Sequence, residues 1–269
     1  MKIGICVNLP APDGEPKGPD TIALASELGY DYVELPLAPL AELDESGYRR
    51  VREKLGEASI KCETFNIFFP ARVRLTGENR DEALVAEYIG RALERAGEVG
   101  AKIVVFGSSG AKNVPEGFLH EKAFWQIVET MKTAAAAAAK NGVRIAIEAL
   151  NRKESNIILN LTDSERLMAA VDEPSVKMLF DYYHFAVESD SFELLSRLVK
   201  ENHIIHTHFA DPMRRAYPIE ASPEFENVFN TLRGAGYDAR CSLEAGLTNP
   251  AEPRAEMETA LAVMRRLAG

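Results

Sequence analysis

Carboxylates and histidines stand at the ends of several apolar runs in this sequence. Glu148 lies within IAIEAL, Asp181 ends VKMLFD, and Glu244 lies within CSLEAG. His206 and His208 are two residues apart in IIHTHF. A strand core should not contain a bare carboxylate, because an unpaired buried charge costs several kcal/mol or takes up a proton. We therefore expect these side chains to share a partner.

A divalent cation is the most economical shared partner. Three carboxylates and an imidazole offer the hard oxygen and nitrogen ligands that suit Mn²⁺, Mg²⁺ or Co²⁺ better than a metal that prefers thiolates. We expect one ion per chain, with Mn²⁺ first and Mg²⁺ or Co²⁺ as alternatives. A single carboxylate at a strand end is more often salt-bridged or loop-facing, so the prediction depends on all four groups lying together.

The elements that must position these residues follow a regular alternation. Short apolar runs alternate with longer stretches in which apolar residues recur at helical spacing, which predicts crossover units and a parallel sheet. The eight runs are 2–8, 30–35, 60–69, 101–107, 143–150, 176–181, 203–209 and 239–245. The 269 residues are close to the roughly 250 of a typical eight-unit barrel. We expect a single (β/α)8 TIM barrel, with residues 1–269 as one domain.

The barrel explains how distant residues can meet. Active sites of such barrels lie at the C-terminal ends of the strands, and the polar residues above end the fifth to eighth runs. A doubly wound open sheet is the alternative, but GSSGAK after the fourth run matches neither common phosphate-loop pattern. Glu34 closes the second run, and it either reaches the mouth of the barrel or pairs with a neighbouring cation.

Composition excludes several classes of partner. The chain has 31 Lys and Arg against 41 Asp and Glu, a net charge of −10. This charge repels nucleic-acid backbones, so we expect no nucleic-acid partner. The three cysteines are far apart in apolar contexts, which indicates reduced, buried thiols. Without a signal peptide or a run of about 20 apolar residues, we expect a cytoplasmic protein with no membrane association.

Four segments resemble a known superfamily. IEALNRKES, FDYYH, HTHFADPMRR and SLEAG are similar to the xylose-isomerase-like sugar isomerases and epimerases, and E-x-x-N-R-x-E resembles their ketose 3-epimerase branch. The resemblance covers most of the chain. It implies a TIM barrel and an isomerase of carbohydrate metabolism whose substrate is a small sugar or sugar phosphate, and barrels of this family often form dimers or tetramers.

The resemblance also implies residue roles. The implied metal ligands are Glu148, Asp181, His208 and Glu244, with His206 structural or supporting the ligands. The implied catalytic pair is Glu148 and Glu244, which would act from opposite faces of a ketose through an enediolate. The implied substrate-binding residues are Glu154, His184 and Arg214.

Departures from the pattern leave alternatives open. Asp211 stands where the ketose epimerases carry Glu, and DPMRR replaces their ExNR, so the identity of the sugar stays open. The same groups could eliminate water, as an inosose-dehydratase-like lyase does. A metal-dependent DNA endonuclease of this fold would need further histidines on the second and third strands, but none precedes His120. A non-catalytic sugar or metal binder is the third alternative.

Overall fold

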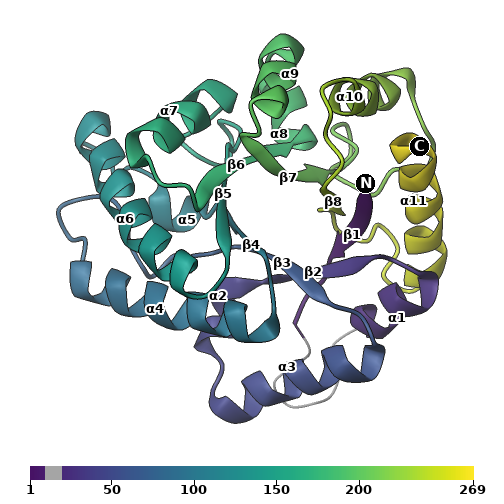
Figure 1. Cartoon of the computed structure of the whole chain (residues 1–269), viewed down its shortest axis with the longest axis horizontal. Coiled ribbons are helices and arrows are strands. Elements are labelled where there is room, and N and C mark those ends of the chain that lie inside the picture. The colour runs from purple at the N-terminus through teal and green to yellow at the C-terminus, as the bar shows by residue number, and fades with distance from the viewer. Residues whose placement is uncertain (10–19) are drawn as a thin grey trace.

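Eight parallel strands close into a barrel in which each strand pairs with its neighbours in sequence and β8 returns to β1 (Figure 1). The computed structural model describes residues 1–9 and 20–269. The strands are β1 Lys2–Cys6, β2 Tyr32–Pro36, β3 Cys62–Asn66, β4 Ile103–Phe106, β5 Arg144–Glu148, β6 Val176–Asp181, β7 Ile204–Phe209 and β8 Arg240–Leu243. The predicted TIM barrel is confirmed. The alternative of an open sheet is wrong, because β1 and β8 pair.

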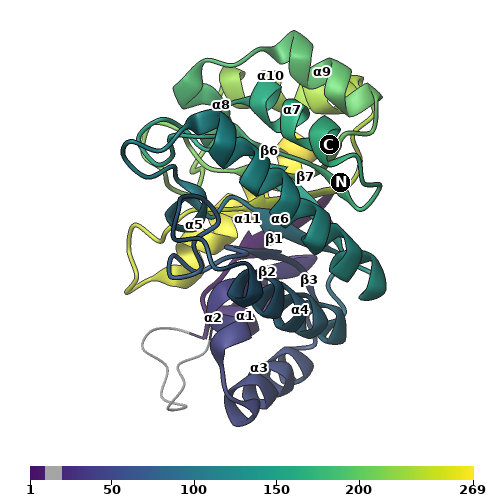
Figure 2. The same cartoon turned by 90° about the vertical axis from the view of Figure 1, so that its left-hand side faces the viewer.

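Helices surround the ring of strands (Figure 1). They are α1 Thr21–Leu28, α2 Leu37–Glu42, α3 Glu45–Ala58, α4 Glu82–Val99, α5 Ser109–Lys112, α6 His120–Lys140, α7 Leu161–Val171, α8 Tyr182–Glu188, α9 Phe192–Lys200, α10 Pro223–Gly234 and α11 Pro253–Ala268. The alanine-rich stretch lies in α6, where Ala134, Ala135 and Ala138 are buried. Helix α6 packs on α4, beside which it lies in Figure 2.

Alternation along each strand separates the packed face from the functional face. Ile145 and Ile147 belong to the main core, which also contains residues of the surrounding helices. Successive strand residues point to opposite faces, so Ala146 and Glu148 share the other face of β5. Ala146 belongs to a smaller apolar cluster with residues of β4, β6 and β7. The Glu148 carboxylate therefore stands above an apolar layer.

The strand register places polar residues of different strands at one level. Asp181 on β6 lies opposite His208 on β7, and His208 lies opposite Ser242 on β8. Strand β1 follows β8 around the barrel, and its Cys6 lies opposite Glu34 on β2. Parallel pairing thus brings together residues that are far apart in sequence.

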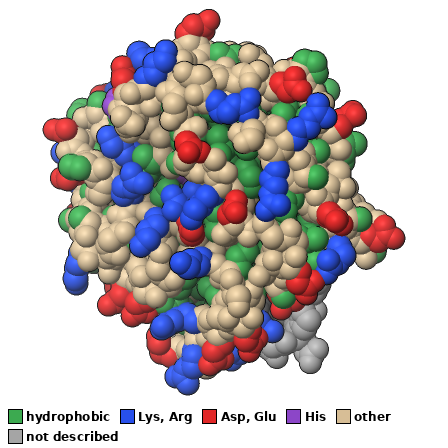
Figure 3. All heavy atoms as spheres, turned by 45° about the vertical axis from the view of Figure 1, so that its right-hand side comes forward, with side chains coloured by type: hydrophobic (Ala, Val, Ile, Leu, Met, Phe, Trp, Pro, Cys, Tyr) green, Lys and Arg blue, Asp and Glu red, His purple; other side chains and the backbone are tan. Residues whose placement is uncertain are grey.

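The outer surface carries mixed charge. On the face shown in Figure 3, Lys and Arg side chains are interspersed with Asp and Glu. Cys62 and Cys241 are buried, Cys6 is half-buried, and all three are free. Within residues 1–9 and 20–269, no helix combines the length and apolar character that crossing a membrane requires.

Candidate metal centre and active site

The Nδ1 atom of His208 is the focus of the predicted ligand set. It lies 3.0 Å from Oε2 of Glu244, 3.2 Å from Oε1 of Glu148 and 3.9 Å from Oδ2 of Asp181. One ligand atom from each of the four residues falls within 4.8 Å of all the others. His208, Glu148 and Asp181 are buried. The structure therefore brings together the four residues that the sequence predicted as ligands.

The donor set fits a divalent cation. One imidazole nitrogen can donate a single hydrogen, yet three carboxylates surround Nδ1 of His208. Burial lowers the pKa of His208, but Glu244 and Glu34 outweigh burial and raise it well above its ordinary value. Burial raises the pKa of Asp181 to about 6, and Glu148 and Glu244 add to that shift. A cation with two charges would neutralise carboxylates that repel one another when they stand alone.

Asp181 has two separate tasks. Its Oδ1 accepts a hydrogen bond from the backbone N–H of His184 at 2.8 Å, which caps helix α8. Its Oδ2 is left to face the cluster. The same turn positions His184, whose Nδ1 accepts a hydrogen bond from the backbone N–H of Asn151 at 3.1 Å. A neutral His184 therefore carries its proton on Nε2 and can donate it to a ligand.

The wall beside Glu148 is shaped for this carboxylate. A Cβ atom on Gly107 would lie 2.1 Å from Oε2 of Glu148, so the absence of a side chain at Gly107 leaves room for the carboxylate. Lys112 is fully buried, and its Nζ donates to the backbone oxygen of Glu148 at 3.3 Å. Burial lowers the pKa of Lys112 to about 8, although Glu148 opposes that shift. Neither residue was singled out from the sequence.

Glu244 borders an open cavity. Its Oε1 accepts a hydrogen bond from the side-chain amide of Asn66 at 2.9 Å, which leaves Oε2 facing His208. The cavity has a volume of about 360 Å³, and its lining includes Asn66, Arg215 and Tyr217. This volume is within the range of about 300–1,000 Å³ that is usual for small-molecule sites.

Two arginines follow β7, and they point to different partners. Arg214 binds the Asp211 carboxylate at 2.7 Å and the backbone oxygen of Tyr217 at 3.3 Å. Arg215 lines the cavity and pairs with both oxygens of Glu154, at 2.7 and 3.2 Å. Its guanidinium also lies over the ring of Tyr183. The substrate-binding role of Arg214 stays a prediction, and Arg215 is a second candidate.

Some features of the site had a signal in the sequence and others had none. Asn66 lies within the third apolar run and ends strand β3, so the criterion that selected Glu148 could have selected it. The criterion also applied to Glu34, which was expected either to reach the mouth of the barrel or to pair with a neighbouring cation. In the structure Glu34 is fully buried and hydrogen-bonded to His206 and His208. The difference between Arg214 and Arg215 depends on the loop backbone, where Arg215 has a φ of 48°.

Comparison with known proteins places the chain in a family. The model of the xylose isomerase-like TIM barrel family matches residues 22–267. The chain is 26% identical to 3-dehydro-D-guloside 4-epimerase of Escherichia coli strain K12 over 141 residues, and this match spans 52% of either chain. It is 24% identical to a probable ketose 3-epimerase of Synechocystis sp., over 82% of this chain and 76% of that relative.

Solved structures share the whole fold at low sequence identity. D-psicose 3-epimerase in the presence of D-fructose has a TM-score of 0.83 and 19% identity, with both chains fully covered. The apo form of 3-keto-D-glucoside 4-epimerase from E. coli has a TM-score of 0.77 and 22% identity, with 99% of each chain covered.

Proposed function

Because the chain belongs to the xylose isomerase-like TIM barrel family, we propose that it is a metal-dependent sugar isomerase or epimerase that acts on a ketose or ketose phosphate. The observation that carries the proposal is the convergence of Glu148, Asp181 and Glu244 on Nδ1 of His208 beside an open cavity. The names of the relatives support the reaction class, since the matches include sugar 3- and 4-epimerases.

The proposed cofactor is one divalent ion, with Mn²⁺ first and Mg²⁺ or Co²⁺ as alternatives. When bound, such an ion would polarise the substrate carbonyl and stabilise the enediolate that forms as the α-proton leaves. The residues that would hold it are Glu148, Asp181, His208 and Glu244. Three carboxylates and one imidazole are the ligand types that these ions accept.

In the proposed reaction, Glu148 and Glu244 move protons on opposite faces of the substrate. One carboxylate removes the α-proton, and the other returns a proton to the opposite face, which inverts the carbon. The two carboxylates are held from different sides: Gly107 leaves space for Glu148, and Asn66 holds Glu244. Return of the proton to the neighbouring carbon would instead give an aldose–ketose isomerisation.

The proposed substrate contacts lie next to these carboxylates. The Nε2–H of His184 can donate to a substrate oxygen, because its Nδ1 is occupied by Asn151. Glu154 and an arginine of the loop after β7 would bind hydroxyls further along the sugar. Arg215 joins Arg214 in this role because Arg215 lines the cavity and pairs with Glu154.

Proton exchange in deuterated water tests the two-carboxylate mechanism. The variants are Glu148→Gln and Glu244→Gln, each loaded with Mn²⁺ and screened against ketoses and ketose phosphates. We expect turnover to fall by about 100-fold or more, the scale of general acid–base catalysis. With one substrate epimer, one variant should still exchange the α-proton without forming product, and with the opposite epimer the variants should exchange roles.

Two results would reject this mechanism. Normal turnover in both variants would show that the carboxylates are not the bases. Release of water from a substrate by the unaltered protein would point instead to a dehydratase that uses the same groups.

A further inference from the structure

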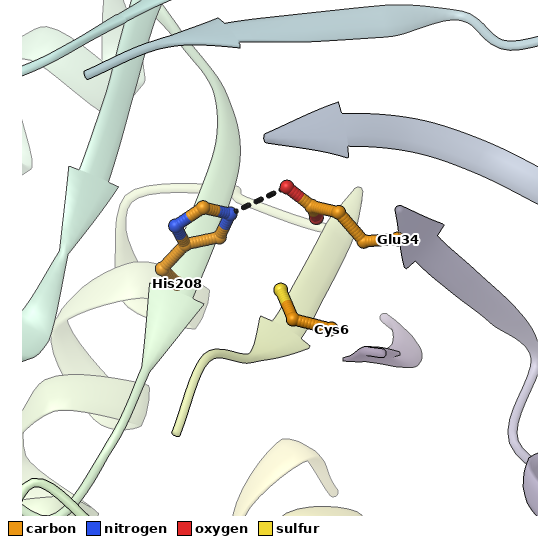
Figure 4. Close-up of side chains that lie close together, drawn as sticks. All are labelled: Cys6, Glu34 and His208. Atoms are coloured by element: carbon orange, nitrogen blue, oxygen red, sulfur yellow. Dashed lines mark hydrogen bonds and ion pairs between the residues drawn. The ribbon is translucent and has the colours of Figure 1, made fainter. Parts of the chain in front are cut away.

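Glu34 lies behind the ligand set and is not a member of it. Its side chain is fully buried on β2, and its carboxylate accepts four hydrogen bonds. Oε2 accepts from Thr64 at 2.7 Å, from Ser242 at 2.6 Å and from His206 at 2.8 Å. Oε1 accepts from Nε2 of His208 at 2.9 Å. Figure 4 shows this last bond, which joins β2 to β7 across the barrel.

The hydrogen bonds around Glu34 determine which nitrogen of each histidine carries a proton. The hydroxyl groups of Thr64 and Ser242 both donate to Oε2, and the four side chains around the carboxylate can all donate a hydrogen to it, which is the environment of an ionised carboxylate. An ionised carboxylate only accepts hydrogen bonds, so both histidines must donate to it from Nε2. The Nδ1 atom of His206 is buried with no hydrogen-bond partner among residues 1–9 and 20–269, in agreement with a neutral ring that carries its proton on Nε2.

The consequence for His208 is a defined ring orientation and tautomer. With Nε2–H committed to Glu34, Nδ1 is the nitrogen that faces Glu148, Asp181 and Glu244, and it would offer its lone pair to a bound metal ion. A carboxylate that accepts from the far nitrogen of a metal-binding imidazole fixes the ring and increases its basicity. We propose that Glu34 is the positioning residue of the candidate metal centre, which presents Nδ1 of His208 as the ligand atom. This inference rests on the metal dependence in the proposed function.

A rival interpretation assigns Glu34 to a second cation site. Cys6, Glu34 and His208 form another group whose potential ligand atoms lie within 4.8 Å of one another. Figure 4 shows the Cys6 side chain beside the pair, without a bond to either residue. Two observations oppose the rival. Oε2 of Glu34 already accepts three hydrogen bonds, and Nε2 of His208 already donates to Oε1, so this nitrogen has no lone pair free for a second cation.

The substitution Glu34→Gln tests the proposal because an amide cannot satisfy every donor. Three donors meet at Oε2, so the amide oxygen of Gln is expected there, and its NH₂ group then faces Nε2 of His208. The imidazole must accept at Nε2 and carry its proton on Nδ1, where the proton competes with the metal. We expect the affinity for Mn²⁺, measured by competition with a chelator, to fall by about 10- to 100-fold.

Glu63→Gln is the matched control. Glu63 is also a buried β-strand glutamate with hydrogen-bonded partners, but these are Lys2 and Arg240, at the starts of β1 and β8. We expect this variant to lose thermal stability while it keeps its affinity for Mn²⁺. Equal losses of Mn²⁺ affinity in the two variants would reduce Glu34 to a structural role and overturn the proposal, as would unchanged affinity in Glu34→Gln.

Nitrogen-15 NMR of the unaltered protein gives a second test that does not depend on the variant folding. With Zn²⁺ as a diamagnetic probe, the His208 resonances should show a proton on Nε2 and the metal on Nδ1. The opposite assignment would overturn the proposal. So would a second Zn²⁺ per chain that Cys6→Ser abolishes, because Nε2 would then be a ligand. If the unaltered protein binds neither Mn²⁺ nor Zn²⁺, the metal-dependent function fails together with this inference, whereas failure of the variant test alone leaves that function standing.

Discussion

Neighbouring arginines in one loop have different surroundings, and their substitution separates two roles. Arg215 lines the cavity and pairs with Glu154, whereas Arg214 binds Asp211. We expect Arg215→Gln to raise KM by about tenfold or more, because a hydrogen bond to a charged group is worth roughly 1.5–3 kcal/mol. Steady-state kinetics of Arg215→Gln and Arg214→Gln, once a substrate is identified, would check this. A larger rise in KM for Arg214→Gln would support the role predicted for Arg214 from the sequence.

Glu63 provides a pH-dependent contribution to stability. Burial raises its pKa, but hydrogen bonds from Lys2 and Arg240 outweigh burial and lower the pKa below 4.5. The folded state then holds fewer protons than the unfolded state near that pH, so the contribution is present above about pH 4.5 and is lost as the pH falls through the folded-state value. Thermal melts of Glu63→Gln should show the largest deficit near pH 7 and a shrinking deficit below pH 4.5. A deficit that does not depend on pH would contradict this origin.

At the scale of an element, the turn after β4 determines where the Glu148 carboxylate can lie. The substitution Gly107→Ala would place a Cβ atom 2.1 Å from Oε2 of Glu148. The flexible side chain can move away, so we expect the melting temperature without metal to change little. The displaced carboxylate should weaken Mn²⁺ binding by about tenfold or more, the lower end of what disturbing a ligand's support costs.

Gly90 in α4 offers the control for this substitution. It is exposed, and a Cβ atom there would have no atom within 4 Å. Ala in a helix interior is favoured over Gly by roughly 0.5–1 kcal/mol, so Gly90→Ala should raise the melting temperature by about 1–4 °C. Its Mn²⁺ affinity should equal that of the unaltered protein. Unchanged affinity in Gly107→Ala as well would show that Glu148 does not need this space.

For the whole molecule, the metal is expected to contribute to the stability of the barrel. Its proposed ligands come from β5, β6, β7 and the residue after β8, so only the folded sheet assembles them. An ion that binds the folded state alone stabilises it by about 2.7 kcal/mol at a concentration of 100 times Kd. We expect Mn²⁺ to raise the melting temperature by about 5–10 °C over the chelated protein.

Metal analysis after reloading completes that test. One ion per chain is the expected result. A chain that retains none, or whose melting temperature is the same with and without chelator, would contradict the metal centre. Three zinc ions per chain would favour the nuclease alternative instead.

Much of this fold could be predicted because its signals are local. The eight runs were readable from apolar residues and their spacing, and each strand except β2, which ends one residue later, lies within its run. Glu148, Asp181, His208 and Glu244 stood out because carboxylates and imidazoles are costly in apolar surroundings. The knowledge that active sites lie at the C-terminal ends of barrel strands then indicated that they would meet.

Only the tertiary structure decided which atoms face one another. Glu34 passed the same test of an acidic residue in an apolar run, yet it lies behind the cluster because β2 approaches His206 and His208 from the other side. The choice between Arg214 and Arg215 depended on one residue's backbone conformation. Sequence patterns indicate which single residues are costly to bury. The role of each buried charge depends on its partners, which strand register and barrel closure bring within hydrogen-bonding distance.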